Sequence, residues 1–375
     1  MSFRKRNVVI GTPSTAASSL PARQDKTLAP GVRPSPLDGR PTTSTGTPSL
    51  DQLLAGHNGF PLGTSLLIQE AGATDFGGTL LRYFAAEGLV QGHHVHLLGY
   101  GDAWRRELPG LDTGGKTSRM ARKETAADDK MKIAWRYEAL GNASSRTTPS
   151  RGQGEAQFCH SFDLAKRLES SHIQGKLYTT QVGDAWARPE RTPFKDFLAG
   201  VAAAVKTTPP NTIHRIIVPG LLSPALYPSA ACRPQEVLQF LHGLRALLRR
   251  HPSQITALVT LPVSLFPRST GLNRWMELLS DGVLELIPLQ HQSQMALEPG
   301  KENKSQGLLR AHSLPVFHEK GGGLEGSWSR EDLSFKLSAS SGLVITPYSL
   351  PPVGEEENAS ATPKATEGKK DALEF

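Results

Sequence analysis

The chain is organised around the segment Leu66-Leu67-Ile68-Gln69-Glu70, which leads through Gly72-Ala73-Thr74-Asp75-Phe76-Gly77-Gly78-Thr79 into Leu80-Leu81-Arg82-Tyr83-Phe84. An apolar run of strand length enters a glycine-containing turn, and a helical pattern with one apolar face leaves it. Strand, loop and helix in this order form the unit that is typical of a P-loop. The segment therefore predicts an α/β fold built around such a loop.

The loop matches the nucleotide-binding pattern G-x-x-x-x-G-K-[ST] only in part. Gly72, Gly77 and Thr79 are in register, but Gly78 stands where the pattern has lysine. That lysine normally offsets the charge of the β- and γ-phosphates, whereas Asp75 adds a negative charge inside this loop. We interpret the segment as a degenerate P-loop, so these four residues are not a confident cofactor site. A chance match by an ordinary strand–turn–helix connection is the alternative.

The segment before the first strand supports the P-loop interpretation. Ser44-Thr45-Gly46 precedes Ser49-Leu50-Asp51, and Pro61-Leu62-Gly63 then leads into the strand. This order is typical of the approach to a RecA-like ATPase core. Ser49 is expected to cap a short helix over 50–54, and Gly56 is expected to end it.

The remaining periodicity indicates strands that alternate with helices. We expect one helix up to about Gln91, others over 194–205 and 235–248, and strands over 94–98, 213–218, 255–261, 283–287, 308–314 and 343–345. Phe162, Ala165 and Leu168 recur at roughly helical spacing. The pattern predicts a RecA-like, mostly parallel sheet flanked by helices, with antiparallel pairs near its C-terminal end.

Composition divides the chain into one domain and polar regions. Of 375 residues, 38% are hydrophobic and 6% aromatic, with 28 prolines and 36 glycines. We therefore expect residues 1–40 and 351–375 to be disordered and residues 41–350 to form the RecA-like domain. Within that domain, polar segments at 102–130 and 142–157 are predicted to be flexible insertions.

The predicted site lacks the groups that ATP hydrolysis needs. The strand Ile216-Ile217-Val218 is followed by Pro219, and the strand 255–261 by Pro262, so neither ends in the carboxylate expected to hold Mg²⁺. Glu70 is the only acid placed to polarise a water, and we favour a solvent-facing strand end for it. His94 and His96 share a strand face, which we interpret as packing or exposure rather than metal binding. We therefore predict no catalytic residue and no metal site.

Charge and cysteine content restrict the class of protein. The formal net charge is +7 and the pI about 9.4, which permits a nucleic-acid partner without requiring one. Two cysteines and the absence of a membrane-spanning apolar run predict a soluble protein of a reducing compartment, with no membrane partner. The residues that could contact nucleic acid are basic positions of the first insertion, which is otherwise a solvated loop: Arg105, Arg106, Arg119, Arg122 and Lys123.

Several segments together resemble a known family, the fourth subunit of the Elongator complex. The resemblance extends from about residue 41 to 352 and is carried by Met1–Arg6, Ser44–Gly46, Leu66–Glu70, Met131–Tyr137, Phe158–Leu164, Val259–Pro267 and Gly307–Pro315. Met131–Tyr137 and the Phe162-Asp163-Leu164 segment are specific to that family. The segment 44–46 is common to RecA-like folds.

The resemblance implies a non-catalytic ring subunit. Such a subunit assembles with Elongator subunits five and six into a hetero-hexameric ring, which binds tRNA and docks on the catalytic subcomplex. The assembly modifies the wobble uridine of tRNA to carboxymethyl derivatives, in the cytoplasm and nucleus. The resemblance implies that ATP takes part only in the assembled ring. Two alternatives stay open: an ATPase with an unorthodox loop acting in tRNA release, and a recombinase-like DNA-binding protein of the same fold.

Overall fold

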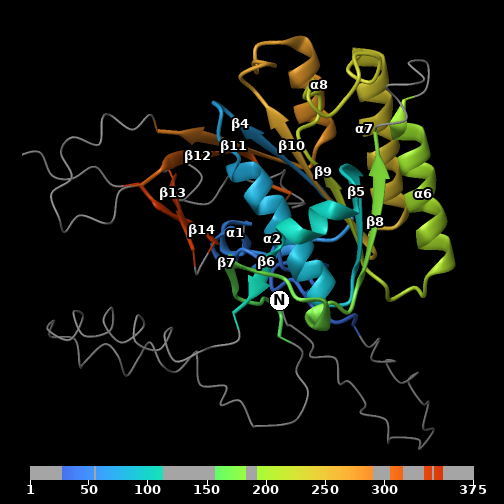
Figure 1. Cartoon of the computed structure of the whole chain (residues 1–375), viewed down its shortest axis with the longest axis vertical. Coiled ribbons are helices and arrows are strands. Elements are labelled where there is room, and N and C mark those ends of the chain that lie inside the picture. Colours follow the sequence, from blue (N-terminus) through green and yellow to red (C-terminus); the bar gives the residue numbers. More distant parts are fainter. Residues whose placement is uncertain are drawn as a thin grey trace, which may run out of the picture.

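The protein is an α/β domain built on one large sheet (Figure 1). A computed structural model describes residues 28–54, 56–112, 157–182, 192–289, 305–315, 333–339 and 342–348. The sheet has nine strands in the order β14-β13-β12-β11-β4-β10-β9-β5-β8. The strand that leads into the loop, β4 (Ser65–Glu70), lies between β10 and β11 and is parallel to both.

The parallel part of the sheet runs from β11 to β8, and the C-terminal strands add to it antiparallel. Its parallel strands besides β4 are β5 (His94–Gly99), β8 (Lys176–Gln181), β9 (His214–Val218), β10 (Ile255–Pro262) and β11 (Gly282–Pro288). The antiparallel strands are β12 (Gly307–Ser313), β13 (Leu333–Ser338) and β14 (Gly342–Pro347). The predicted RecA-like fold class is confirmed.

Helices cover both faces of the sheet, which explains why every residue of β4 is buried. Figure 1 shows α6 and α7 side by side, and separated from α2 by the sheet. Leu66 and Ile68 belong to the core on the α2 side, whereas Leu67, between them, belongs to the core of α6, α7 and α8. The helices are α1 (Pro48–Leu53), α2 (Phe76–Val90), α6 (Pro193–Thr207), α7 (Pro234–Arg250) and α8 (Gly271–Leu279). No helix within these residue ranges is long and apolar enough to cross a membrane.

A buried arginine joins the N-terminal turn to the sheet. Arg215 of β9 is fully buried, and its guanidinium donates hydrogen bonds to Ser44 O (2.9 Å), Thr43 Oγ1 (2.8 Å), Phe84 O (2.9 Å) and His93 Nδ1 (3.0 Å). Burial lowers its pKa to about 10, so the side chain stays charged at neutral pH. It thereby fixes the Ser-Thr-Gly segment against α2.

Two expectations for the N-terminal part of the domain are wrong. The domain begins well before residue 41, because β1 (Val32–Pro34) pairs with β2 (Pro41–Thr43), which pairs with β3 (Phe60–Pro61). Ala29 also packs against Leu62. Ser49 does not cap α1. Its hydroxyl donates to Leu343 O (2.8 Å), and Thr47 occupies the N-cap position without a side-chain hydrogen bond.

The first polar insertion also begins later than predicted. Residues 102–112 form the 3-10 helix η1 (Asp102–Glu107) and strand β6 (Pro109–Leu111), because Trp104 and Leu108 are buried against the core. β6 pairs with β7 (Phe162–Arg167), so the helical spacing expected after Phe162 is wrong. A second 3-10 helix, η2 (Ser170–His172), follows β7. Most of the predicted insertions and tails, 1–27, 113–156 and 351–375, lie outside the described residues.

Candidate functional site

The loop between β4 and α2 is closed by the carboxylate that ends β4. Glu70 Oε1 accepts hydrogen bonds from Thr74 Oγ1 (2.7 Å) and from the Phe76 N–H (2.8 Å). Its other oxygen, Oε2, accepts from the Gly77 N–H (2.8 Å). In a nucleotide-binding P-loop, such N–H groups at the start of the helix bind phosphate oxygens. Here the chain supplies the anion itself.

Glu70 is buried, which corrects the expectation that it faces solvent. The residue is only 8% exposed and lies at the end of β4, where the strand enters the loop. Burial raises the pKa of its carboxyl above the ordinary value, while the hydrogen bonds from Thr74, Gly77 and Phe76 oppose that shift. Glu70 is therefore a desolvated carboxyl group that already accepts three hydrogen bonds, so it is poorly suited to activate a water.

The other polar side chains of the loop are also engaged. Asp75 Oδ2 pairs with Arg82 Nη2 (2.9 Å), and Arg82 Nη1 lies 3.6 Å from Glu107 Oε2. The hydroxyl of Thr79, which would bind Mg²⁺ in a P-loop, donates to Asp75 O (3.1 Å) and accepts from Arg82 (3.2 Å). A Cβ on Gly78 would lie 2.0 Å from Asp75 Oδ1. A side chain at the position of the missing lysine would therefore have to displace the carboxylate of Asp75.

The neighbouring strands bring no carboxylate to the loop from their own ends. Thr260, near the end of β10, accepts a hydrogen bond from the Gly220 N–H (2.7 Å), and the Gly72 N–H donates to Ser264 Oγ (2.7 Å). In the parts of the chain that the structure describes, no three His, Cys, Asp or Glu side chains form a group that could hold a metal ion. The bond from Gly72 ties the loop to the segment after β10, and the bond from Gly220 ties β10 to the segment after β9.

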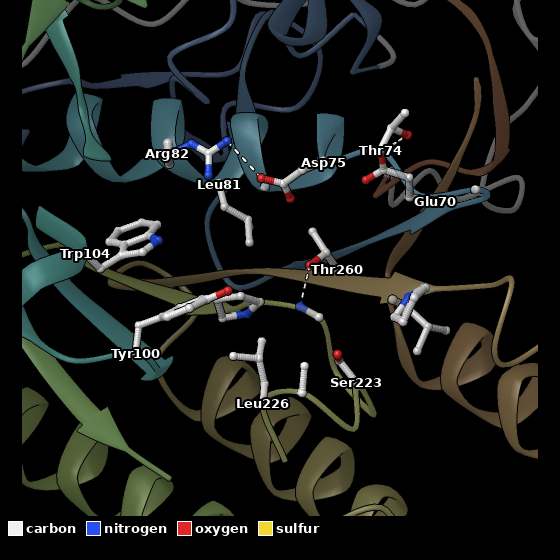
Figure 2. Close-up of a pocket in the computed structure, with 17 residues that line it drawn as sticks. Glu70, Thr74, Asp75, Leu81, Arg82, Tyr100, Trp104, Ser223, Leu226 and Thr260 are labelled. Carbon is white, nitrogen blue, oxygen red and sulfur yellow. Dashed lines mark hydrogen bonds and ion pairs between the residues drawn. The ribbon is translucent and has the colours of Figure 1, made fainter. Parts of the chain in front are cut away.

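A cavity of about 270 Å³ opens beside the closed loop. Figure 2 shows Leu81 and Leu226 facing each other across it, with Tyr100 and Trp104 at one end. The rings of Tyr100 and Trp104 are nearly parallel, with centroids 6.5 Å apart. Sequence reasoning did not find these two aromatic residues, because they follow β5 in a segment that looked like the start of a polar loop.

The histidines of the β5 face are packed against each other. His96 Nε2 lies 3.0 Å from His214 Nδ1, and the ring of His96 stacks on Tyr178 with centroids 4.9 Å apart. Burial lowers the pKa of His96 to about 3 and that of His214 to about 4. These side chains are therefore neutral packing groups at physiological pH.

The predicted site residues divide into two groups. Gly72, Gly77, Gly78 and Thr79 come together in the loop and the first turn of α2. The basic candidates Arg105 and Arg106 lie on η1, beside the loop, since Glu107 of η1 lies 3.6 Å from Arg82 of α2. Arg105 donates to Ser170 Oγ (2.8 Å). Contact of these two arginines with nucleic acid stays a prediction. Three further basic candidates lie outside the described residues: Arg119, Arg122 and Lys123.

The fold and the loop define a class: a RecA-like α/β domain whose phosphate loop is closed by its own carboxylate. The chain belongs to the PAXNEB protein family, whose sequence model matches residues 25–375. The resemblance to the fourth subunit of the Elongator complex is thereby confirmed.

Relatives with the name Elongator complex protein 4 align with most of the chain. The protein from Schizosaccharomyces pombe is 31% identical over 371 residues, covering 95% of this chain and 94% of its own. The protein from Saccharomyces cerevisiae is 28% identical, covering 78% of this chain and 70% of its own. A KaiC-like protein structure from Pyrococcus horikoshii aligns with 82% of this chain and 99% of its own, with 16% identity and a TM-score of 0.41.

Proposed function

We propose that this chain is a non-catalytic subunit of the Elongator complex. In this proposal it assembles with Elongator subunits five and six into a hetero-hexameric RecA-like ring, which docks on the catalytic subcomplex. The ring binds tRNA and supports modification of its wobble uridine to carboxymethyl derivatives, in the cytoplasm and nucleus. The names of the relatives support membership in the complex.

The observation that carries the non-catalytic role is the position of Glu70. Its carboxylate takes up the N–H groups of Phe76 and Gly77 that would otherwise face phosphate oxygens. A competent P-loop also needs the lysine, and Gly78 stands in its place beside Asp75. We therefore propose that the isolated chain has no nucleotide cofactor, and that ATP in the assembly is bound by other chains.

Co-purification tests the assembly. The tagged chain is co-expressed with Elongator subunits five and six from the same organism, and the mass of the complex is measured by native mass spectrometry. Recovery of the three chains in equal amounts supports the ring. A tagged chain that stays monomeric in the presence of both partners overturns it.

A salt titration of the reconstituted assembly tests the nucleic-acid partner. The net charge of +7 suits a phosphate backbone, and affinity for tRNA is expected to fall steeply with salt because counterions are released on binding. Tighter binding to duplex DNA than to tRNA at the same salt concentration would favour the recombinase-like alternative instead.

A further inference from the structure

The last parallel strand of the sheet has an open edge. β8 pairs with β5 and with no other strand among the described residues (Figure 1). The Lys176 N–H donates to His93 O (3.3 Å), so the backbone of Lys176 faces β5. Backbone groups of successive residues point to opposite sides of a strand, and those of Leu177 and Thr179 therefore point away from the sheet. Within the described residues, neither of these two N–H groups has a hydrogen-bond partner.

A hollow of about 680 Å³ lies along this edge. Its volume is within the range of roughly 300–1,000 Å³ that is usual for ligand sites. The floor is apolar and is formed by side chains that belong to or pack against the core of the α2 side: Leu89, Leu168, Ile173 and Leu177. An open strand edge beside an apolar depression is the arrangement that lets a protein bind an extended peptide as an added strand.

The rim of the hollow is basic. Arg105, Arg106 and Lys176 line it, against the single carboxylate of Asp102. Asp102 Oδ1 already accepts a hydrogen bond from the Thr179 hydroxyl (2.7 Å). Arg106 is exposed and has no ion-pair partner in the part of the chain that the structure describes. The charge of the rim therefore favours an acidic partner.

The apolar floor of the hollow favours a peptide over a nucleic acid as the partner. A phosphate backbone gains nothing from four aliphatic side chains, whereas a leucine or valine side chain is stabilised by burial among them. Base stacking would need an aromatic ring beside the floor, and the ring of Tyr178 stacks on His96 on the face of β8 opposite to Leu177. The observations favour the peptide.

We propose that the edge of β8 and the adjoining hollow dock an extended segment of another polypeptide. The segment adds as a strand beside β8 and bonds to the outward backbone groups of Leu177 and Thr179. One apolar side chain occupies the floor, and acidic side chains two residues before and after it, on the same face, meet Arg105 and Arg106. The proposal does not rest on the ring assembly proposed above, and it assigns Arg105 and Arg106 to a peptide instead of to nucleic acid.

The probe is an acetylated, fluorescein-labelled peptide Glu-Val-Leu-Val-Glu, whose leucine and two glutamates share one strand face. Its binding to the full chain is measured by fluorescence anisotropy, together with hydrogen exchange of the β8 amides. Saturable binding with new protection of the Leu177 and Thr179 amides is expected. A matched peptide with lysine in place of both glutamates is expected to bind at least tenfold more weakly. Equal binding of the two peptides overturns the proposal.

Matched variants test separately the backbone hydrogen bonds of the β8 edge and the charge of the basic side chains. Thr179→Pro removes one outward N–H, and its affinity for the acidic peptide is expected to fall about threefold to tenfold, the equivalent of one hydrogen bond. Thr179→Ala loses the hydroxyl bond to Asp102, as the proline variant does, but keeps the N–H, so it is the reference for the proline variant. Arg106→Glu is expected to weaken binding, whereas Arg274→Glu, at an exposed position of α8, leaves it unchanged.

Two further results would contradict the proposal. One is a Thr179→Pro chain that folds, as judged by circular dichroism, and binds the peptide as well as Thr179→Ala does. The other is displacement of the peptide by a single-stranded RNA oligonucleotide whose own binding leaves the β8 amides unprotected, which would assign the hollow to nucleic acid. The Arg106→Glu variant keeps the proposal testable even if the proline variant does not fold.

Discussion

Replacement of Glu70 by glutamine tests whether its carboxylate closes the loop. The amide keeps the shape of the side chain but turns one acceptor oxygen into an NH₂ group. Either Oε2 is replaced and the Gly77 N–H loses its acceptor, or Oε1 is replaced and both Thr74 and Phe76 lose theirs. A buried donor without a partner costs about 1–3 kcal/mol, and the hydrogen bonds that survive become neutral and weaker.

The cost is offset in part, because the neutral amide is easier to bury than the carboxylate, whose pKa burial raises. We expect Glu70→Gln to lower the free energy of unfolding by about 2 kcal/mol in urea titrations at pH 7. Glu107→Gln is the matched control, since that exposed carboxylate lies 3.6 Å from Arg82 and is expected to contribute less than about 0.5 kcal/mol. Equal stability of the two variants would refute the reasoning.

Glu70→Ala extends the test by exposing the loop N–H groups to solvent. Inorganic phosphate is expected to stabilise this variant, by about 1.4 kcal/mol at ten times its dissociation constant, and to leave the wild type unaffected. Thermal melts with and without phosphate measure the stabilisation of the variant and of the wild type. A wild type that phosphate stabilises as much as the variant would show that Glu70 does not occupy the site.

Three further predictions concern the core and the loop. Arg215→Lys is expected to lower the free energy of unfolding by about 3–5 kcal/mol in urea titrations, because an ammonium cannot satisfy the buried acceptors that the planar guanidinium reaches. A loss below about 1 kcal/mol would contradict the role of Arg215 in joining the N-terminal turn to the sheet. Gly78→Lys is expected to confer no ATP binding in calorimetry, since the new side chain displaces Asp75 and the loop stays closed; micromolar binding would contradict this. The folded-state pKa of His96, about 3, lies below the ordinary 6.5, so its stabilisation is complete above pH 6.5 and declines as pH falls. Between pH 6 and pH 5, His96→Asn is expected to reduce the pH dependence of unfolding by about 1.2 kcal/mol, as measured by urea titrations at the two pH values.

The central sheet could be predicted because its strands are continuous apolar runs. β4, β9 and β10 are buried on both faces, and α7 presents a regular apolar stripe, so periodicity alone located them. The edge strand β8 was not predicted, because none of its residues is fully buried and they include a lysine, two threonines and a glutamine. Such a strand is defined by its pairing with β5 rather than by its own pattern.

Helix α8 was missed for a related reason. Asn273 is a buried polar residue in the middle of its inward face, where it accepts from Gln69 Nε2 (2.8 Å) and donates to Phe266 O (2.8 Å). A polar residue at a core position breaks the apolar periodicity on which the prediction depended. The hydrogen bond from Gln69 joins residues 204 positions apart, and no local window contains both.

The candidate site was predicted in its residue types but not in its central contact. The missing lysine at Gly78 is visible in the sequence, and it is the basis for interpreting the loop as degenerate. The role of Glu70 is not visible, because it depends on the path of the chain between Gly72 and Gly77, which turns the helix N–H groups back toward the end of β4. An acid at the last position of the loop strand, followed by a loop without lysine, is the sequence signal that would have pointed to it.

Calorimetric titration of Mg²⁺-ATP into the isolated wild-type chain tests the central claim most directly. Because Glu70 occupies the loop N–H groups and Gly78 supplies no charge, we predict no saturable heat up to millimolar nucleotide. Saturable binding with a micromolar dissociation constant, lost in a Thr79→Ala variant, would show that the loop accepts a triphosphate and would contradict the account.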